Sequence, residues 1–218
     1  MKEIAMRYAA FVCGLFLLAL AISMMAVAAL GVTPISSVNY VLSLNTPMSF
    51  GTATFVFNIV VIILQFLLIR GGYGTRKDRI EILLQIPFSL LFGLFIDFNM
   101  SVLSQLHLGG YAQRMAMLLA GCIIQALGVV LEVRSNVVIM SAEGFVKYAA
   151  RRTGKEFGRV KVMFDAALVA TAVCLSLLMA GTVSGVREGT IVAALCTGNL
   201  VTLISTRLFT PMRLSRFL

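Results

Sequence analysis

Long, nearly uncharged runs of apolar residues constrain this chain more than any other feature. A transmembrane helix needs roughly 20 such residues to cross about 30 Å of hydrocarbon. Lipid offers no hydrogen bonds to the backbone, so a chain can cross it only as helices or as a closed barrel. The runs here are continuous rather than alternating, which favours helices. The predicted spans cover residues 8–30, 50–68, 80–103, 115–133, 157–180 and 190–209.

The composition agrees with this interpretation. Hydrophobic residues make up 60% of the 218 residues and charged residues only 12%, whereas a soluble domain is nearer half apolar and a quarter charged. We therefore expect an all-α integral membrane protein of about six spans, forming a single membrane domain over residues 1–218. The net charge of +9 does not predict a nucleic-acid partner, because the basic residues lie in short loops beside the spans. Membrane lipids are the expected surroundings, and the sequence does not predict an oligomeric state.

The basic residues are divided unevenly between the two sides of the predicted bundle. Cytoplasmic loops of multipass proteins carry the excess of Lys and Arg. Of the 18 basic residues, only Arg114 and Arg187 fall on one side. The others are Lys2, Arg7, Arg70, Arg76, Lys77, Arg79, Arg134, Lys147, Arg151, Arg152, Lys155, Arg159, Lys161, Arg207, Arg213 and Arg216. This distribution predicts a multipass protein of a bacterial cytoplasmic membrane with both termini on the cytoplasmic side.

The two halves of the sequence share a short pattern at the same spacing. It consists of Phe50-Gly51 followed by Phe57-Asn58, and Phe157-Gly158 followed by Phe164-Asp165. In each half an irregular segment comes before the pattern, at residues 31–49 and 134–156. Three spans per half would give the halves opposite orientations, which is a recurring plan of secondary transporters. We therefore predict a 3+3 inverted repeat, with repeat one at about 1–106 and repeat two at about 107–218.

Both irregular segments contain signals for a short helix that would re-enter the bilayer. Thr33 is suited to an N-cap with Pro34 at the first helical position. Ser141 is suited to an N-cap with Glu143 in the first turn. Helix N-termini that point into the bundle would favour an anionic ligand group. Ordinary interfacial loops are the alternative for both segments.

Two carboxylates within the spans are candidates for binding a coupling ion or proton. Ionisable groups at membrane depth are costly and usually face a cavity or a partner. Asp165 is the first candidate, and its alternative role is a structural pair with Lys161 one helical turn earlier. Asp97 is the second candidate, and its alternative role is at the boundary of its span.

Polar side chains in the spans and in the irregular segments are candidates for lining a substrate site. They are Thr33, Ser36, Ser37, Asn58, Ser141, Glu143 and Asn199. Amide and hydroxyl side chains in helical bundles also join helices by hydrogen bonds, which is the alternative for Asn58 and Asn199. The chain has no P-loop, HExxH or GxSxG motif. We expect no enzymatic activity, catalytic residue, cofactor or metal.

Four stretches resemble the YczE/YitT-type family of bacterial multipass membrane proteins. They are Leu30-Gly-Val-Thr-Pro-Ile-Ser-Ser37, Gly93-Leu-Phe-Ile-Asp97, Phe157-Gly-Arg-Val-Lys-Val-Met-Phe-Asp165 and Val186-Arg-Glu-Gly-Thr-Ile-Val-Ala-Ala194. The resemblance implies a small membrane protein of mostly uncharacterised function that is often suspected of transport or export. It implies no substrate, cofactor or catalytic residue. The charged stretch 76–81 departs from the pattern and affects the alignment of the repeats before the third span.

Two classes of function follow from these observations. The first is a small secondary transporter or permease for a small polar or amphiphilic organic solute, anionic solutes included, that works by alternating access between two three-span halves. The second is a non-transporting scaffold or sensor that binds a partner through its basic cytoplasmic loops, chiefly residues 147–161. A lipid-handling or membrane-enzyme role would need polar groups clustered at one interface.

Overall fold

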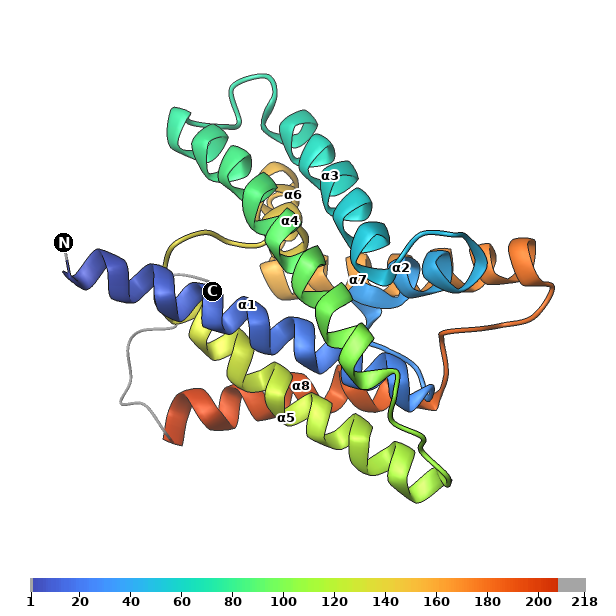
Figure 1. The fold of residues 1–218 in the computed structure, drawn as a ribbon. Coiled ribbons are helices and arrows are strands. Elements are labelled where there is room, and N and C mark those ends of the chain that lie inside the picture. The colour runs from blue at the N-terminus through green and yellow to red at the C-terminus, as the bar shows by residue number, and fades with distance from the viewer. Residues whose placement is uncertain (1, 208–218) are drawn as a thin grey trace.

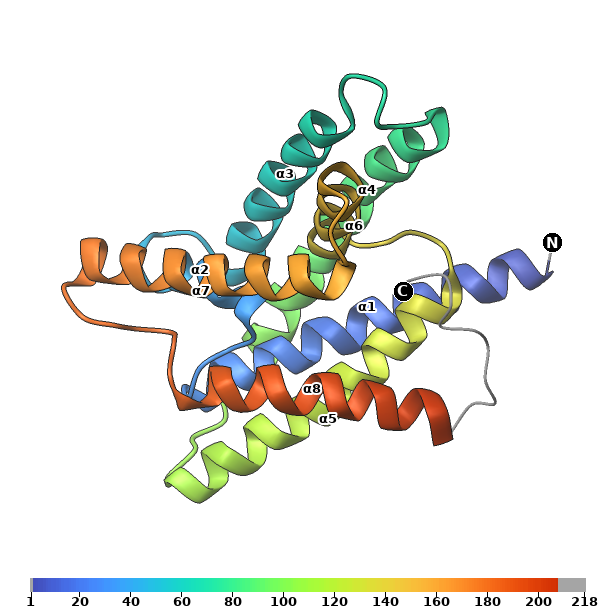
Figure 2. The same ribbon diagram turned by 180° about the vertical axis from the view of Figure 1, so that it is seen from behind.

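The computed structural model describes residues 2–207 as α-helices joined by turns and short extended segments (Figures 1 and 2). The helices are α1 (Lys2–Ala28), α2 (Pro34–Asn45), α3 (Phe50–Ile69), α4 (Arg76–Leu103), α5 (Tyr111–Ser135), α6 (Ser141–Thr153), α7 (Phe157–Ala180) and α8 (Glu188–Arg207). The all-α prediction is confirmed. The predicted end of the sixth span at Phe209 and the basic residues Arg213 and Arg216 lie outside the described residues.

Five of these helices, α1, α3, α4, α5 and α7, are long and apolar enough to cross a membrane. Within α8, residues Glu188–Ile204 form a shorter apolar helix at the position of the sixth predicted span. The chain is therefore a multipass membrane protein. In Figure 1 the N-terminus, the α3–α4 turn and the end of α8 lie on one side of the bundle, while the α4–α5 and α7–α8 connections lie on the other. We call the first the basic side, because most of the Lys and Arg residues flank the helices there.

The two halves of the chain have the same order of elements, a long helix followed by a short one and two long ones. α1 and α5 run antiparallel through the centre (Figure 1). They approach closely because Gly14, Gly121 and Gly128 leave room for the backbone of the partner helix. α4 packs on α1, and α8 packs on α5 in the same way. This matching arrangement of two oppositely directed halves agrees with an inverted repeat.

The short helices bridge the halves. α2 packs on α3 and α7, and α6 packs on α7 and α3, so each short helix lies between one long helix of its own half and one of the other. The main core cluster packs several helices together, with Ile22 and Met25 of α1, Tyr40 of α2, Phe50 of α3 and Ile96 of α4 among its buried side chains. The Tyr40 hydroxyl donates to the Ala26 carbonyl oxygen over 3.0 Å, which satisfies its polar end inside this core.

Several predicted boundaries differ from the structure. Residues 76–79, which precede the third predicted span at 80–103, form the first turn of α4, because Thr75 and Asp78 make a capping box there. Thr33 is the N-cap of α2, with Pro34 in the first turn, as predicted. The prediction that Ser141 is an N-cap is wrong. Met140 occupies the N-cap and Ser141 is the first helical residue, because its hydroxyl donates to Asn58 rather than accepting from the backbone.

Candidate functional site

The N-terminus of α6 is buried against α3 by polar contacts. Ser141 is 1% exposed, and its Oγ donates to Oδ1 of Asn58 over 2.6 Å. Asn58 is itself buried, and its Nδ2 makes no hydrogen bond to any described residue. A buried donor without a partner is costly. It marks this point as one where a ligand or water oxygen could bind.

Two glutamines extend this contact to α4. Gln65 and Gln85 are fully buried and exchange two hydrogen bonds, of 2.8 and 3.1 Å. Gln65 also donates to the Ser141 carbonyl oxygen over 3.0 Å. Gly144 faces the pair, and a Cβ there would lie 2.7 Å from Gln65 Oε1 and 2.8 Å from Gln85 Nε2. The pair therefore closes around a glycine that leaves no room for a side chain.

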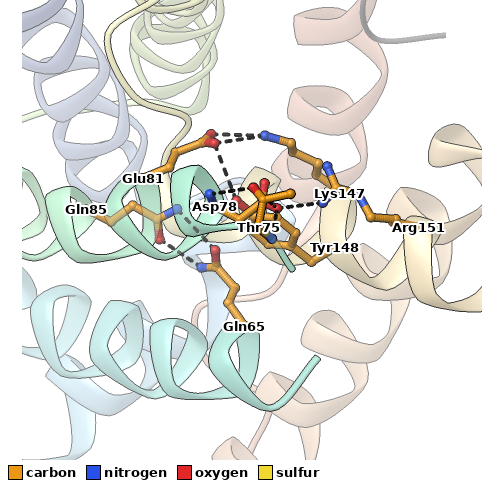
Figure 3. A network of polar contacts seen from close by, with 8 residues as sticks. All are labelled: Gln65, Thr75, Asp78, Glu81, Gln85, Lys147, Tyr148 and Arg151. Atoms are coloured by element: carbon orange, nitrogen blue, oxygen red, sulfur yellow. Dashed lines mark hydrogen bonds and ion pairs between the residues drawn. The ribbon is translucent and has the colours of Figure 1, made fainter. Parts of the chain in front are cut away.

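Two ion pairs join α6 to α4 nearer the basic side (Figure 3). Arg151 donates to Asp78 over 2.9 Å, and the Asp78 side chain is only 8% exposed. Lys147 pairs with Glu81 over 3.1 Å. Tyr148 completes the cluster by donating to Glu81 over 3.4 Å.

The surroundings of Tyr148 disfavour its ionised form. Burial raises the pKa of the Tyr148 hydroxyl, and the carboxylates of Glu81 and Asp78 raise it further. Since Arg152 also donates to the carbonyl oxygens of Leu67 and Leu68, the C-terminal part of α6 is tied to the ends of both α3 and α4.

These contacts define the course of the second short segment. Asn58 lies about 16 Å along α3 from Ile69, at about 1.5 Å per residue, which is roughly half of a hydrocarbon thickness of about 30 Å. Residues 136–140, between α5 and α6, have no helical structure. α6 then begins beside Asn58 and returns to Asp78 and Arg152 at the ends of α3 and α4. α6 therefore starts part-way along α3 and runs back toward the C-terminal end of α3.

The first short segment holds hydroxyl and amide groups in the equivalent helix. Thr33 Oγ1 donates to Ser36 Oγ over 3.2 Å, and Ser37 donates to the Pro34 carbonyl oxygen over 2.6 Å. Asn39 Nδ2 donates to Thr54 over 3.4 Å, while its Oδ1 is buried and accepts no hydrogen bond from the described residues. The predicted residues Thr33, Ser36 and Ser37 are thus brought together at the N-terminus of α2.

Asp97 binds the beginning of α3 on the side opposite the basic one. Its two oxygens accept from the Gly51 amide and the Ser49 hydroxyl, each over 2.7 Å. It thereby serves as an anionic cap for a helix N-terminus, where a carboxylate is favoured. Asp97, Tyr40 and Phe50 also line an open groove of about 560 Å³ between α2, α3 and α4.

The remaining predicted site residues lie apart from one another. Asp165 pairs with Lys161 over 3.2 Å within α7, as the alternative prediction had it. Glu143 is half-buried in α6, close enough to Glu132 of α5 for their charges to interact. Asn199 is exposed on α8, and its amide donates to the Leu195 carbonyl oxygen of its own helix.

A family model supplies the comparison with known proteins. The model of a family of unknown function, DUF6198, matches residues 5–206. The chain belongs to this family. No curated protein and no solved structure matches the chain. The DUF6198 match covers the eight helices of the described residues nearly end to end, including both short helices.

Sequence reasoning missed the two glutamines and the partners of the basic loop in this DUF6198 protein. Gln65 and Gln85 each interrupt an apolar run, which is the same signal that singled out Asn58 and Asn199. The basic residues of α6 were interpreted as determinants of orientation. Two of them instead pair with Asp78 and Glu81, residues far away in the sequence.

Proposed function

We propose that this protein is a small secondary transporter of the bacterial cytoplasmic membrane, with both termini cytoplasmic. It moves a small polar or amphiphilic organic solute by alternating access between its two halves. The observation that carries the proposal is the pair of short helices at equivalent places in two oppositely directed halves, each with buried polar side chains at its N-terminus. Secondary transporters bind their substrates at such discontinuous helices. The sequence resemblance to the YczE/YitT-type proteins points in the same direction.

The substrate site of this proposal lies at the start of α6. The unpaired Asn58 Nδ2 and the first amides of α6 are donors, and the helix N-terminus carries a partial positive charge. This combination favours a carboxylate or another anionic group on the solute. On the other half, Thr33 and Ser36 provide the equivalent hydroxyls at the start of α2.

Asp165 is the proposed coupling carboxylate. Its one hydrogen-bonding partner among the described residues is Lys161, four residues away in the same helix. Protonation would therefore break no contact between helices, so the group can gain and lose a proton while α7 moves. Asp97 remains a second proposed site, although its protonation would also release the N-terminus of α3.

The test is flux into proteoliposomes loaded with a pH-sensitive dye. The probes are a series of mono- and dicarboxylates and a matched series of organic amines, each added with and without a pH gradient. We expect flux of at least one carboxylate that Asn58→Ala lowers more than tenfold and Asp165→Asn uncouples from the gradient. Thr171→Ala is the matched control, because this exposed hydroxyl bonds only within α7. Flux no greater than in protein-free vesicles for every probe would contradict transport.

The alternative proposal, a scaffold that binds a partner through residues 147–161, has less support. Lys147, Arg151 and Arg152 are engaged by carboxylates and carbonyl groups of the chain itself. Lys155 and Arg159 remain at the surface, and Arg159 pairs only with Glu156 over 3.3 Å among the described residues. Replacing Arg151, Arg152 and Lys155 by Gln would abolish capture of a partner and spare flux if this alternative holds.

A further inference from the structure

Most of the packing of the two halves matches, but two interfaces of α4, with α3 and with α6, have no equal counterpart at α8 among the described residues. The interface between α1 and α4 has its counterpart in the interface between α5 and α8. Likewise, the interface between α2 and α3 has its counterpart in the interface between α6 and α7. α3 and α4 form one of the largest interfaces of the protein. Among the described residues no interface of comparable extent joins their counterparts, α7 and α8. These two helices lie apart from each other in both views (Figures 1 and 2).

Two glycines make the α3–α4 interface close. A Cβ on Gly51 would overlap the Gly93 carbonyl oxygen, and one on Gly93 would lie 2.8 Å from the Gly51 carbonyl oxygen. Helix backbones can meet in this way in a membrane only where small residues face each other. The same Cβ on Gly93 would lie 3.6 Å from the Cβ of Phe55. Together with the Asp97 bonds to Ser49 and Gly51, these contacts shut α3 against α4 on the side opposite the basic one.

The second half contains glycines at the equivalent places. Gly158 corresponds to Gly51 because both follow the phenylalanine that begins the helix. Gly198 corresponds to Gly93, because these two lie 105 positions apart, close to the 107 positions that separate Gly51 from Gly158. A Cβ on either Gly158 or Gly198 would meet no described atom within 4 Å.

The neighbours of these glycines are exposed as well. On α7, Val162 is 69% exposed and Ala166 is exposed. On α8, Ala194 and Thr202 lie one turn before and after Gly198 and are also exposed. Helix surfaces built of small residues suit close contact with another helix. Here they lie on the faces that the repeat predicts should meet.

We propose that α7 and α8 close against each other through Gly158 and Gly198 in a second conformation, as α3 and α4 do through Gly51 and Gly93 in this one. In an inverted repeat the two halves can exchange conformations, so closure on the basic side would accompany opening of α3 from α4 on the other. The structure then represents the state that is open on the basic side. The role of this motion in transport rests on the proposed function, whereas the closure itself can be tested without a substrate.

The test is disulfide formation between Val162→Cys and Gly198→Cys in full-length protein in liposomes, with Cys13, Cys122, Cys174 and Cys196 replaced by Ser. Val162 corresponds to Phe55, so the closed state would bring the two Cβ atoms to about 3.6 Å, as Gly93 and Phe55 indicate. Disulfides need a Cβ separation of about 3.5–4.5 Å. After mild oxidation, free thiols are counted by the gel shift that a polymer-linked maleimide produces. We expect a monomer-sized band without tags.

The control pair is Leu178→Cys with Gly198→Cys. Leu178 is 83% exposed near the far end of α7, where neither conformation brings it to Gly198. Untagged monomer at no more than the level of this control would overturn the closure. A disulfide found only in dimer-sized bands would also overturn it, because the open face would then join two copies. If the protein transports a solute but does not form this disulfide, the transport proposal holds and the closure is refuted. If the disulfide forms in a protein that transports no solute, the closure holds and the transport proposal is refuted.

Discussion

Replacing Gly51 by Ala should destabilise the protein, whereas the same change at Gly158 should not. The two residues hold equivalent places at the starts of α3 and α7. At Gly51 the new methyl group would overlap the backbone of α4 and lie 2.6 Å from the Asp97 carboxyl carbon. At Gly158 it would meet no described atom within 4 Å. Comparing the two variants thus separates the effect of packing on stability from the effect of helix propensity.

The expected magnitudes follow from these surroundings. Overpacking between two backbones costs about 1–3 kcal/mol, and loosening the charged hydrogen bonds of Asp97 adds about 1.5 kcal/mol. Alanine is favoured over glycine in a helix by up to about 1 kcal/mol. The net change at Gly51 is therefore a loss of about 1.5–3.5 kcal/mol, or roughly 3–14 °C in Tm for a chain of this size. At Gly158 the change is zero or a small gain.

The assay is thermal loss of helical circular dichroism in one detergent, with wild type and both variants measured in parallel. A parallel measurement follows the reaction of the buried Cys122 thiol with a fluorogenic maleimide, which reports loss of the core. If Gly51→Ala melts within about 2 °C of wild type, the contact between Gly51 and Gly93 does not hold α3 to α4. If Gly158→Ala is as destabilised as Gly51→Ala, α7 is covered by protein in the folded state and the asymmetry of the halves is wrong.

Further predictions concern the polar network and the open face. Gln65→Leu should cost about 2 kcal/mol of stability because it leaves Gln85 buried without a partner, and the double change to Leu at both positions should recover most of the loss in a thermal melt. Arg151→Gln should lower the free energy of unfolding by about 1–2 kcal/mol, because it removes the cation from the nearly buried Asp78 carboxylate. Arg159→Gln, at an exposed ion pair, should change it by less than about 0.5 kcal/mol. Equal shifts in the two thermal melts would refute this difference. Gly198→Leu should fold and melt like wild type yet lose flux, because the side chain would fill the space that α7 needs in order to close; unchanged flux would count against that motion.

The sequence predicted the helices better than it predicted their partners. Continuous apolar runs located the long helices, and the proline after Thr33 located the start of α2. The contact between Asn58 and Ser141 joins two predicted site residues that are 83 positions apart in the sequence. Which polar residues meet could not be predicted in general, because hydropathy shows that a residue lies in a span but not which side of the helix faces protein.

The charged residues of α6 illustrate this limit. The positive-inside rule accounts for Lys147 and Arg151 by their side of the membrane alone. It gives no reason for them to pair with Glu81 and Asp78, since that pairing depends on α6 folding back beside α4. Asn199 is an error of the opposite kind, because it was predicted to line a site but, within the described residues, its amide makes no hydrogen bond to another helix. A polar residue within a span can form its hydrogen bond within its own helix and stay exposed.

The unequal cover of α7 also bears on how this protein behaves outside its native bilayer. Backbone atoms and a carboxylate fasten α3 to α4, but on its open flank only acyl chains can shield α7. Bilayer thickness, the charge of the lipid headgroups and the chain length of a detergent should therefore affect the stability of the second half far more than that of the first. Purification in short-chain surfactants would then loosen α7 and α8 first, and added phospholipid should restore them.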